Sequence, residues 1–208
     1  MTHIIIFAKA PIAGFAKTRL IPVLGAKGAG QLAQQLLGHA LVEALAVERA
    51  SIELCVTPAI NDPLWHSVSL PEGVSITDQG EGDLGQRMAR ASQRALLTHT
   101  SIIIMGTDCP GLDRVYLHQA IERLHRTDAC ITPVEDGGYA LIGLKKYRAD
   151  IFNDIPWSTD SVCAITLKRF EQLAWHVAIL PALYDIDEAS DLKHLDEKRW
   201  GLINSSAK

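Results

Sequence analysis

The chain has few cysteines, and no two of them lie close together in sequence. The four cysteines are Cys55, Cys109, Cys130 and Cys163. Zinc sites and dithiol redox centres normally use closely spaced pairs, so this scatter argues against both and predicts four reduced thiols. The eight histidines likewise form no cluster with the spacing of metal ligands.

Long apolar runs and an excess of positive charge are also missing. The apolar runs are about as long as strands and are broken by charges, so we predict no membrane span. The N-terminus enters the run Ile4-Ile5-Ile6 without the architecture of a signal peptide, and we therefore expect a cytoplasmic protein. The formal net charge of -4 gives no reason to expect nucleic acid as a partner.

What is present is the composition of a soluble globular chain. Hydrophobic residues make up 48% and charged residues 21% of the 208 positions. This length can bury one substantial core, so we predict a single domain over residues 1–208. The apolar content would accommodate the contact patch of a homodimer without requiring one.

Short β-branched runs alternate with amphipathic helical stretches along the chain. This alternation predicts a three-layer α/β/α fold with a mostly parallel central sheet. The predicted strands are His3–Ala8, Ile52–Thr57, Val74–Thr77, Ile102–Met105, Ala129–Val134, Tyr139–Leu144 and Val177–Leu180. The predicted helices are Ala26–Val47, Leu84–Leu97, Asp113–Leu124, Asp160–Leu173 and Glu188–Arg199, with a turn or short helix at Asp62–Ser67.

One carboxylate stands where a buried strand opens into a loop. Asp108 lies in Gly106-Thr107-Asp108-Cys109-Pro110, directly after the apolar run Ile102–Met105. Open α/β sheets bind ligands at such strand ends, and a carboxylate there suits a divalent cation that holds a diphosphate. Asp108 could instead cap the next helix, but Asp113 lies closer to that helix's apolar pattern. We therefore favour Asp108 as a metal ligand.

The loop after the first strand concentrates positive charge. Lys9, Lys17 and Arg19 lie between the first strand and the first long helix, where phosphates would meet fixed charge and backbone amides. The loop has neither the Gly-Lys-Ser/Thr end of a Walker P-loop nor the Gly-x-Gly-x-x-Gly spacing. The alternatives are a different type of phosphate loop or a solvated basic loop, and its place at a strand end favours the former.

Three further segments have both a binding and a structural interpretation. The glycines of Gln79–Gly85 would let backbone approach a ligand, but Asp83 is about as well suited to capping the next helix, with Gln86 completing a capping box. Glu135-Asp136-Gly137-Gly138 is typical of a tight turn between strands, and the alternative is that its acidic side chains face the pocket. Asp185 and Asp187 share a face if the backbone is extended, so one of them could join Asp108 at a metal; helix capping is the alternative.

Together these segments resemble the rSAM/selenodomain-associated transferase 1 family, within the nucleotide-diphospho-sugar transferase superfamily. The resemblance covers nearly the whole chain, with five matches in the expected order. The matching segments are Phe7-Ala8-Lys9-Ala10-Pro11 with Gly14 and Lys17-Thr18-Arg19-Leu20, Gly82-Asp83-Leu84-Gly85 with Arg87-Met88, Gly106–Pro110, Asp136-Gly137-Gly138-Tyr139, and Trp157-Ser158-Thr159 with Val162. A late Asp-x-Asp-Thr-Pro-x-Asp-Leu pattern of distant relatives is also present, with Glu188-Ala189 in place of Thr-Pro.

The resemblance implies the Rossmann-like glycosyltransferase A fold and a transferase that depends on Mg2+ or Mn2+. It implies that Lys9, Lys17 and Arg19 neutralise phosphates, and that Asp108, with Asp187 as a weaker partner, holds the metal. Base and ribose would lie along Ala8 and the segment that contains Gln79, Gly82, Asp83 and Gly85. Asp136 is the candidate base for an acceptor.

Three functions fit these residues. In glycosyl transfer the ligand is a nucleotide sugar, and in nucleotidyl transfer it is a nucleoside triphosphate that releases pyrophosphate. The basic loop would serve either reaction, and we favour glycosyl transfer to a small-molecule acceptor because the family is usually placed with sugar transferases. The third function is a non-catalytic nucleotide-binding module, which would have no need of a metal clamp.

Overall fold

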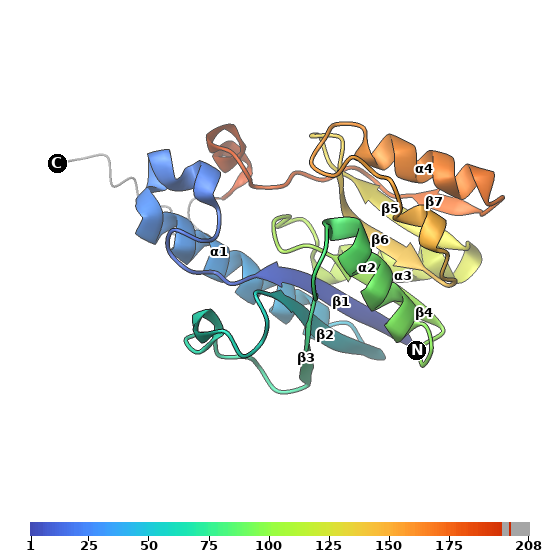
Figure 1. Cartoon of the computed structure of the whole chain (residues 1–208), viewed down its shortest axis with the longest axis horizontal. Coiled ribbons are helices and arrows are strands. Elements are labelled where there is room, and N and C mark those ends of the chain that lie inside the picture. The colour runs from blue at the N-terminus through green and yellow to red at the C-terminus, as the bar shows by residue number, and fades with distance from the viewer. Residues whose placement is uncertain (197–199, 201–208) are drawn as a thin grey trace.

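Seven strands form one sheet in the order β3-β2-β1-β4-β6-β5-β7, with helices on both faces (Figure 1). The computed structural model describes residues 1–196 and residue 200. The strands are β1 (Thr2–Lys9), β2 (Ala50–Thr57), β3 (Val74–Asp78), β4 (Ser101–Met105), β5 (Ala129–Pro133), β6 (Tyr139–Leu144) and β7 (Val177–Ile179). The helices are α1 (Ile21–Leu45), α2 (Leu84–Ala95), α3 (Arg114–Arg126) and α4 (Val162–Gln172). Short 3-10 helices lie at Thr18–Leu20, Pro63–Trp65, Ala149–Ile151 and Ala189–His194.

The sheet is mostly parallel, as predicted. β1 pairs in parallel with β2 and β4, β2 with β3, and β5 with β7, whereas β6 runs antiparallel to β4 and β5. Because β6 alone is reversed, the carboxyl ends of the other six strands meet at one edge of the sheet. That edge also carries the turn between β5 and β6.

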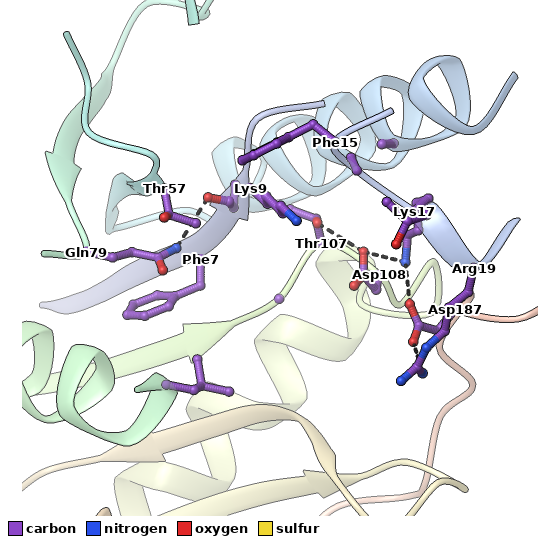
Figure 2. Close-up of a pocket in the computed structure, with 16 residues that line it drawn as sticks. Phe7, Lys9, Phe15, Lys17, Arg19, Thr57, Gln79, Thr107, Asp108 and Asp187 are labelled. Carbon is purple, nitrogen blue, oxygen red and sulfur yellow. Dashed lines mark hydrogen bonds and ion pairs between the residues drawn. The ribbon is translucent and has the colours of Figure 1, made fainter. Parts of the chain in front are cut away.

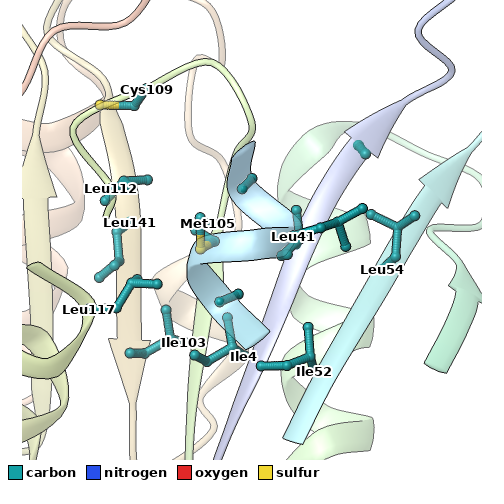
Figure 3. Close-up of a cluster of buried hydrophobic side chains, with 14 of the residues drawn as sticks. Ile4, Leu41, Ile52, Leu54, Ile103, Met105, Cys109, Leu112, Leu117 and Leu141 are labelled. Atoms are coloured by element: carbon teal, nitrogen blue, oxygen red, sulfur yellow. The ribbon is translucent and has the colours of Figure 1, made fainter. Parts of the chain in front are cut away.

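The alternation of apolar residues along the strands supplies a core on each face. Ile4, Ile6 and Ala8 of β1 pack in a cluster with residues of α1 and α3, part of which Figure 3 shows. Ile5 points to the opposite face and packs in a cluster with residues of α2 and α4. Successive side chains of a strand face opposite ways, so one apolar run serves two layers.

The segment after β7 folds back onto α1. Ile186 is fully buried in a third cluster with Leu20, Leu32 and Leu36. Its backbone N–H donates to the Asp108 carbonyl at 2.8 Å. Burial of Ile186 therefore brings its neighbour Asp187 to the first loop and to the end of β4.

The predicted strands and helices are confirmed, with small shifts at their ends, except for the last predicted helix. The predicted helix Ala26–Val47 matches the part of α1 after Gly25 (φ 69°), where the helix is interrupted, but α1 ends at Leu45, two residues before the predicted end. The α-helix predicted over Glu188–Arg199 is wrong for Ala189–His194, which form a 3-10 helix, and residues 197–199 lie outside the described part. Leu192 and Leu195 both pack on α1, and their spacing of three matches a 3-10 turn. In the described residues, no helix has the length and apolar character needed to cross a membrane.

Candidate active site

A pocket of about 420 Å³ opens at the carboxyl edge of the sheet. Its walls come from the ends of β1, β2 and β4, the residue after β3, the first loop and the segment after β7. The polar and charged side chains among its lining residues are Lys9, Lys17, Thr18, Arg19, Thr57, Gln79, Thr107, Asp108 and Asp187. The strand order switches sides at β1: β2 and β3 lie on one side of β1, and β4, which is parallel to β1, lies on the other. The pocket therefore occupies the position where open α/β sheets bind ligands.

Lys17 lies at the centre of the charged wall (Figure 2). Its Nζ lies 2.7 Å from Asp108 Oδ1 and 3.8 Å from Asp187 Oδ1, and it also donates to the Ile186 carbonyl. Only 4% of the Lys17 side chain is exposed, whereas 50% of Asp108 and 40% of Asp187 is exposed. The structure thus brings together a basic loop residue and two carboxylates that are far apart in sequence.

The other two cations of the first loop are held more loosely. Arg19 Nη1 lies 2.7 Å from Asp187 Oδ2, and the Arg19 side chain is 63% exposed. Lys9 Nζ lies 4.3 Å from the centroid of the Phe15 ring, which is a cation–π distance. All three predicted cations of the loop therefore lie in one pocket, with Asp108.

Gln79, the residue after β3, forms side-chain hydrogen bonds to β1 and β2 at the pocket. Its Nε2 donates to the Ala8 carbonyl at 3.3 Å and to the Cys55 carbonyl at 3.0 Å. These two acceptors fix the orientation of the buried amide, with Oε1 on the side of Arg87 Nη1 at 3.4 Å. Ala8 and Gln79 both line the pocket.

The rest of the predicted nucleotide segment has structural roles in the fold. Asp83 caps α2 and forms a capping box with Gln86, and Gly82 (φ 101°) precedes this cap. A Cβ on Gly85 would lie 2.5 Å from the Phe152 carbonyl oxygen, so Gly85 allows close packing. Gly82, Asp83 and Gly85 are not among the residues that line the pocket.

Asp136 lies in the turn between β5 and β6. Its exposed carboxylate accepts a hydrogen bond from the Gly138 N–H at 2.8 Å, and it is not among the residues that line the pocket. Burial raises the pKa of the nearby Asp185 to about 6, and the Asp136, Asp187 and Asp191 carboxylates add to this rise. Asp136 and Asp185 thus belong to an acidic region beside the pocket.

Several lining residues were not predicted from the sequence. Phe15, Thr57 and Thr107 join the wall, and Arg87 contacts Thr57 Oγ1 at 3.4 Å. Thr57 lines the pocket because β2 pairs with β1, and the sequence does not reveal which strands pair. Arg87 lies in one of the segments that resemble the family. That resemblance was the signal in the sequence that could have identified it.

No curated protein matches the chain significantly. Among solved structures, a protein from Desulfovibrio desulfuricans G20, provisionally described as a nucleotide-diphospho-sugar transferase, is 31% identical with a TM-score of 0.86. The match covers 92% of this chain and 84% of that protein.

Two more distant structures share the fold. A cytidylyltransferase from Leptospira borgpetersenii serovar Hardjo-bovis is 15% identical with a TM-score of 0.59, and the match covers 95% of this chain and 89% of that one. CMP:2-keto-3-deoxy-manno-octonic acid synthetase, complexed with CTP, is 13% identical with a TM-score of 0.56 and 99% coverage of both chains.

The fold is therefore that of the nucleotide-diphospho-sugar transferase superfamily. Residues 40–159, more than half of the chain, match the family described as "Uncharacterized protein conserved in bacteria (DUF2064)". The chain belongs to this family.

Proposed function

We propose that the chain is a glycosyltransferase that moves a sugar from a nucleotide-diphospho-sugar to a small-molecule acceptor, with Mg2+ or Mn2+ as its cofactor. The observation that carries this proposal is the convergence of Lys9, Lys17 and Arg19 with Asp108 in one pocket at the switch point of the sheet. The 31% identity with the Desulfovibrio protein favours sugar transfer over other uses of a nucleotide. The family resemblance to rSAM/selenodomain-associated transferases 1 supports the same proposal.

The two pocket carboxylates fit a hard divalent cation. Mg2+ at phosphate sites is commonly held by one or two carboxylates, with phosphate and water oxygens completing its shell. Asp108 and Asp187 are half exposed toward the same pocket, so their oxygens would supply this protein contribution. Among the described residues no group of three or more His, Cys, Asp or Glu side chains is arranged to hold a metal. A bound cation would offset the charge that develops on the leaving diphosphate.

The chain's own residues account for binding and charge stabilisation. The cations of the first loop line the pocket in which a diphosphate would lie, so their positive charge would stabilise a leaving diphosphate. Base and ribose would lie along Ala8 and Gln79. Asp136 is the proposed base that takes the acceptor's proton, from the turn next to Asp185.

A thermal-shift panel tests this proposal. The purified protein is heated with nucleotide sugars and with nucleoside triphosphates, each with and without Mg2+ or Mn2+. A ligand at 100 times its Kd stabilises the folded state by about 2.7 kcal/mol, which for a domain of this size raises Tm by about 5–10 °C. We expect a metal-dependent rise with one nucleotide sugar.

Variants locate the effect in the pocket. Asp108→Asn should lose the metal-dependent rise, whereas Asp113→Asn, which keeps the cap that Tyr116 N–H donates to at 2.8 Å, should retain it. With the donor identified, Asp136→Asn should keep the thermal shift and lose turnover; unchanged turnover would exclude Asp136 as the base.

The alternatives give different results in the same panel. A rise with triphosphates alone would replace glycosyl transfer by nucleotidyl transfer. A nucleotide-induced rise that needs no metal would favour the non-catalytic module. No rise with any compound, in a protein that melts cooperatively, would overturn the proposal.

A further inference from the structure

Lys17 holds the position between the two carboxylates that would bind a cation. Its ammonium nitrogen is 2.7 Å from Asp108 and 3.8 Å from Asp187, so the positive charge lies where the two negative charges converge (Figure 2). Arg19 also contacts Asp187, but its side chain is mostly exposed and its attraction is therefore weakened by solvent. Lys17 is thus the buried counter-charge of the pair.

The fold fixes Lys17 in this place. Its backbone is left-handed (φ 50°, ψ 42°), a conformation that is unfavourable for a non-glycine residue and that persists where the surroundings impose it. The Ile186 carbonyl accepts a third contact from the ammonium, and Ile186 is itself fully buried. If the buried ammonium moved away from these partners without gaining a new anion, its positive charge would be left without a partner, which is unfavourable.

We propose that Lys17 prevents divalent cations from binding to the free protein and allows them to bind only together with a diphosphate. We call this function of Lys17 the latch. This inference rests on the proposed function of the pocket. A dication between Asp108 and Asp187 would stand a few ångströms from the ammonium, and the two positive charges would repel each other. A diphosphate gives Lys17 a new anionic partner, so Lys17 turns to the phosphate and releases the two carboxylates.

The first test is Mn2+ binding to the protein alone, measured by electron paramagnetic resonance of free Mn2+. Lys17→Met keeps the length of the side chain and removes its charge. We expect this variant to bind Mn2+ at least about tenfold more tightly than the wild type, which corresponds to about 1.4 kcal/mol. Lys27→Met, an exposed position on α1 that is not among the residues lining the pocket, should bind as the wild type does.

A Lys17→Met variant that binds Mn2+ no more tightly than the wild type would overturn the latch. Its far-ultraviolet circular dichroism is compared with that of the wild type, because the result requires a folded variant.

A second experiment uses the wild-type protein and does not depend on whether the variant folds. In 1H–15N spectra of the lysine ammonium groups, the Lys17 signal should stay in place with Mg2+ alone and move with Mg2+ plus pyrophosphate. Movement with Mg2+ alone would contradict the inference.

These outcomes are separate from those that test the transferase. Tighter Mn2+ binding by Lys17→Met, with no thermal shift by any nucleotide sugar or triphosphate, would support the latch and overturn the proposed reaction. A metal-dependent shift with a nucleotide sugar, combined with unchanged Mn2+ affinity of Lys17→Met, would support the reaction and overturn the latch.

Discussion

Glu53 is a buried acid outside the pocket, on β2, and its side chain is 3% exposed. It accepts hydrogen bonds from Arg94 Nη1 at 2.8 Å and from Thr77 Oγ1 at 2.6 Å, and its Oε2 lies 2.9 Å from His3 Nε2. Burial raises the pKa of Glu53, but the hydrogen bonds from Arg94, His3 and Thr77 outweigh it and lower the pKa to about 2. The carboxylate is thus ionised across the whole neutral range.

The network predicts how stability depends on pH. Because the folded pKa lies below the ordinary value of 4.5, the stabilisation by ionised Glu53 is complete above pH 4.5 and is lost as the pH falls toward 2. We expect Glu53→Gln to lower the free energy of unfolding by about 2–3 kcal/mol at pH 7, since charge-assisted hydrogen bonds are lost. Urea unfolding of both proteins at pH 7 and pH 3 measures this. The difference in the free energy of unfolding between the wild type and Glu53→Gln should be smaller at pH 3 than at pH 7. An equal difference at the two pH values would contradict the lowered pKa of Glu53.

Lys17 and Asp108 show how far the sequence located the site residue by residue. Each was recognised because a charged side chain followed a strand, and strand ends bind ligands. Their direct contact was not predictable, since it depends on how the first loop folds over α1. The residues alone left Asp185 and Asp187 both open, and the family resemblance pointed to Asp187; burial of Ile186 places Asp187 beside Lys17.

At the scale of elements, α2 begins at a capping box. Asp83 Oδ1 accepts from the Gln86 N–H at 2.8 Å, and the Asp83 N–H donates to Gln86 Oε1 at 3.0 Å. The sequence left a cap and a nucleotide contact open for Asp83, and the geometry is that of a cap. The segment before α2 is also held by Arg90, which donates to the carbonyls of Gln79 and Glu81.

The cap predicts the effect of two substitutions at Asp83. Asp83→Ala should lower the free energy of unfolding by about 1 kcal/mol, because the Gln86 N–H in the first turn of α2 loses its acceptor. Asp83→Asn should cost much less, since asparagine caps helices about as well. Thermal or urea unfolding measures both, and equal losses in the two variants would contradict the capping role.

The strands and helices themselves were largely predictable, because their apolar residues repeat with periods that the sequence displays directly. The prediction succeeded for short runs such as Ile102–Met105, which became β4. It was wrong for Ala189–His194, where packing of Leu192 and Leu195 on α1 overrides the helical pattern. Strand order was also beyond the sequence, since it depends on long-range pairing.

At the scale of the whole molecule, the four cysteines report on global unfolding. All four are buried thiols. Burial raises the pKa of Cys55 to about 11 and those of Cys109 and Cys130 to about 12, so the reactive thiolate is scarce.

We expect the folded protein to react slowly with dithionitrobenzoate at pH 8 and to expose four thiols at once when it unfolds. The absorbance of the released thiolate, followed across a urea series, measures this, and its midpoint should agree with that of circular dichroism. One thiol that reacts rapidly without urea would indicate local opening near that residue instead.

The sequence by itself determined most of the elements, the α/β class and which charged side chains follow the strands, because periodicity, turn residues and charged side chains at strand ends are local properties. Only the tertiary structure decided that Thr57 and Gln79 share a pocket with Asp108, since this follows from the order of β3, β2, β1 and β4. Only the tertiary structure placed Lys17 between Asp108 and Asp187, because burial of Ile186 against α1 brings a segment about 170 residues away to the first loop. Contacts of that range are set by packing of the whole core, which no local pattern encodes.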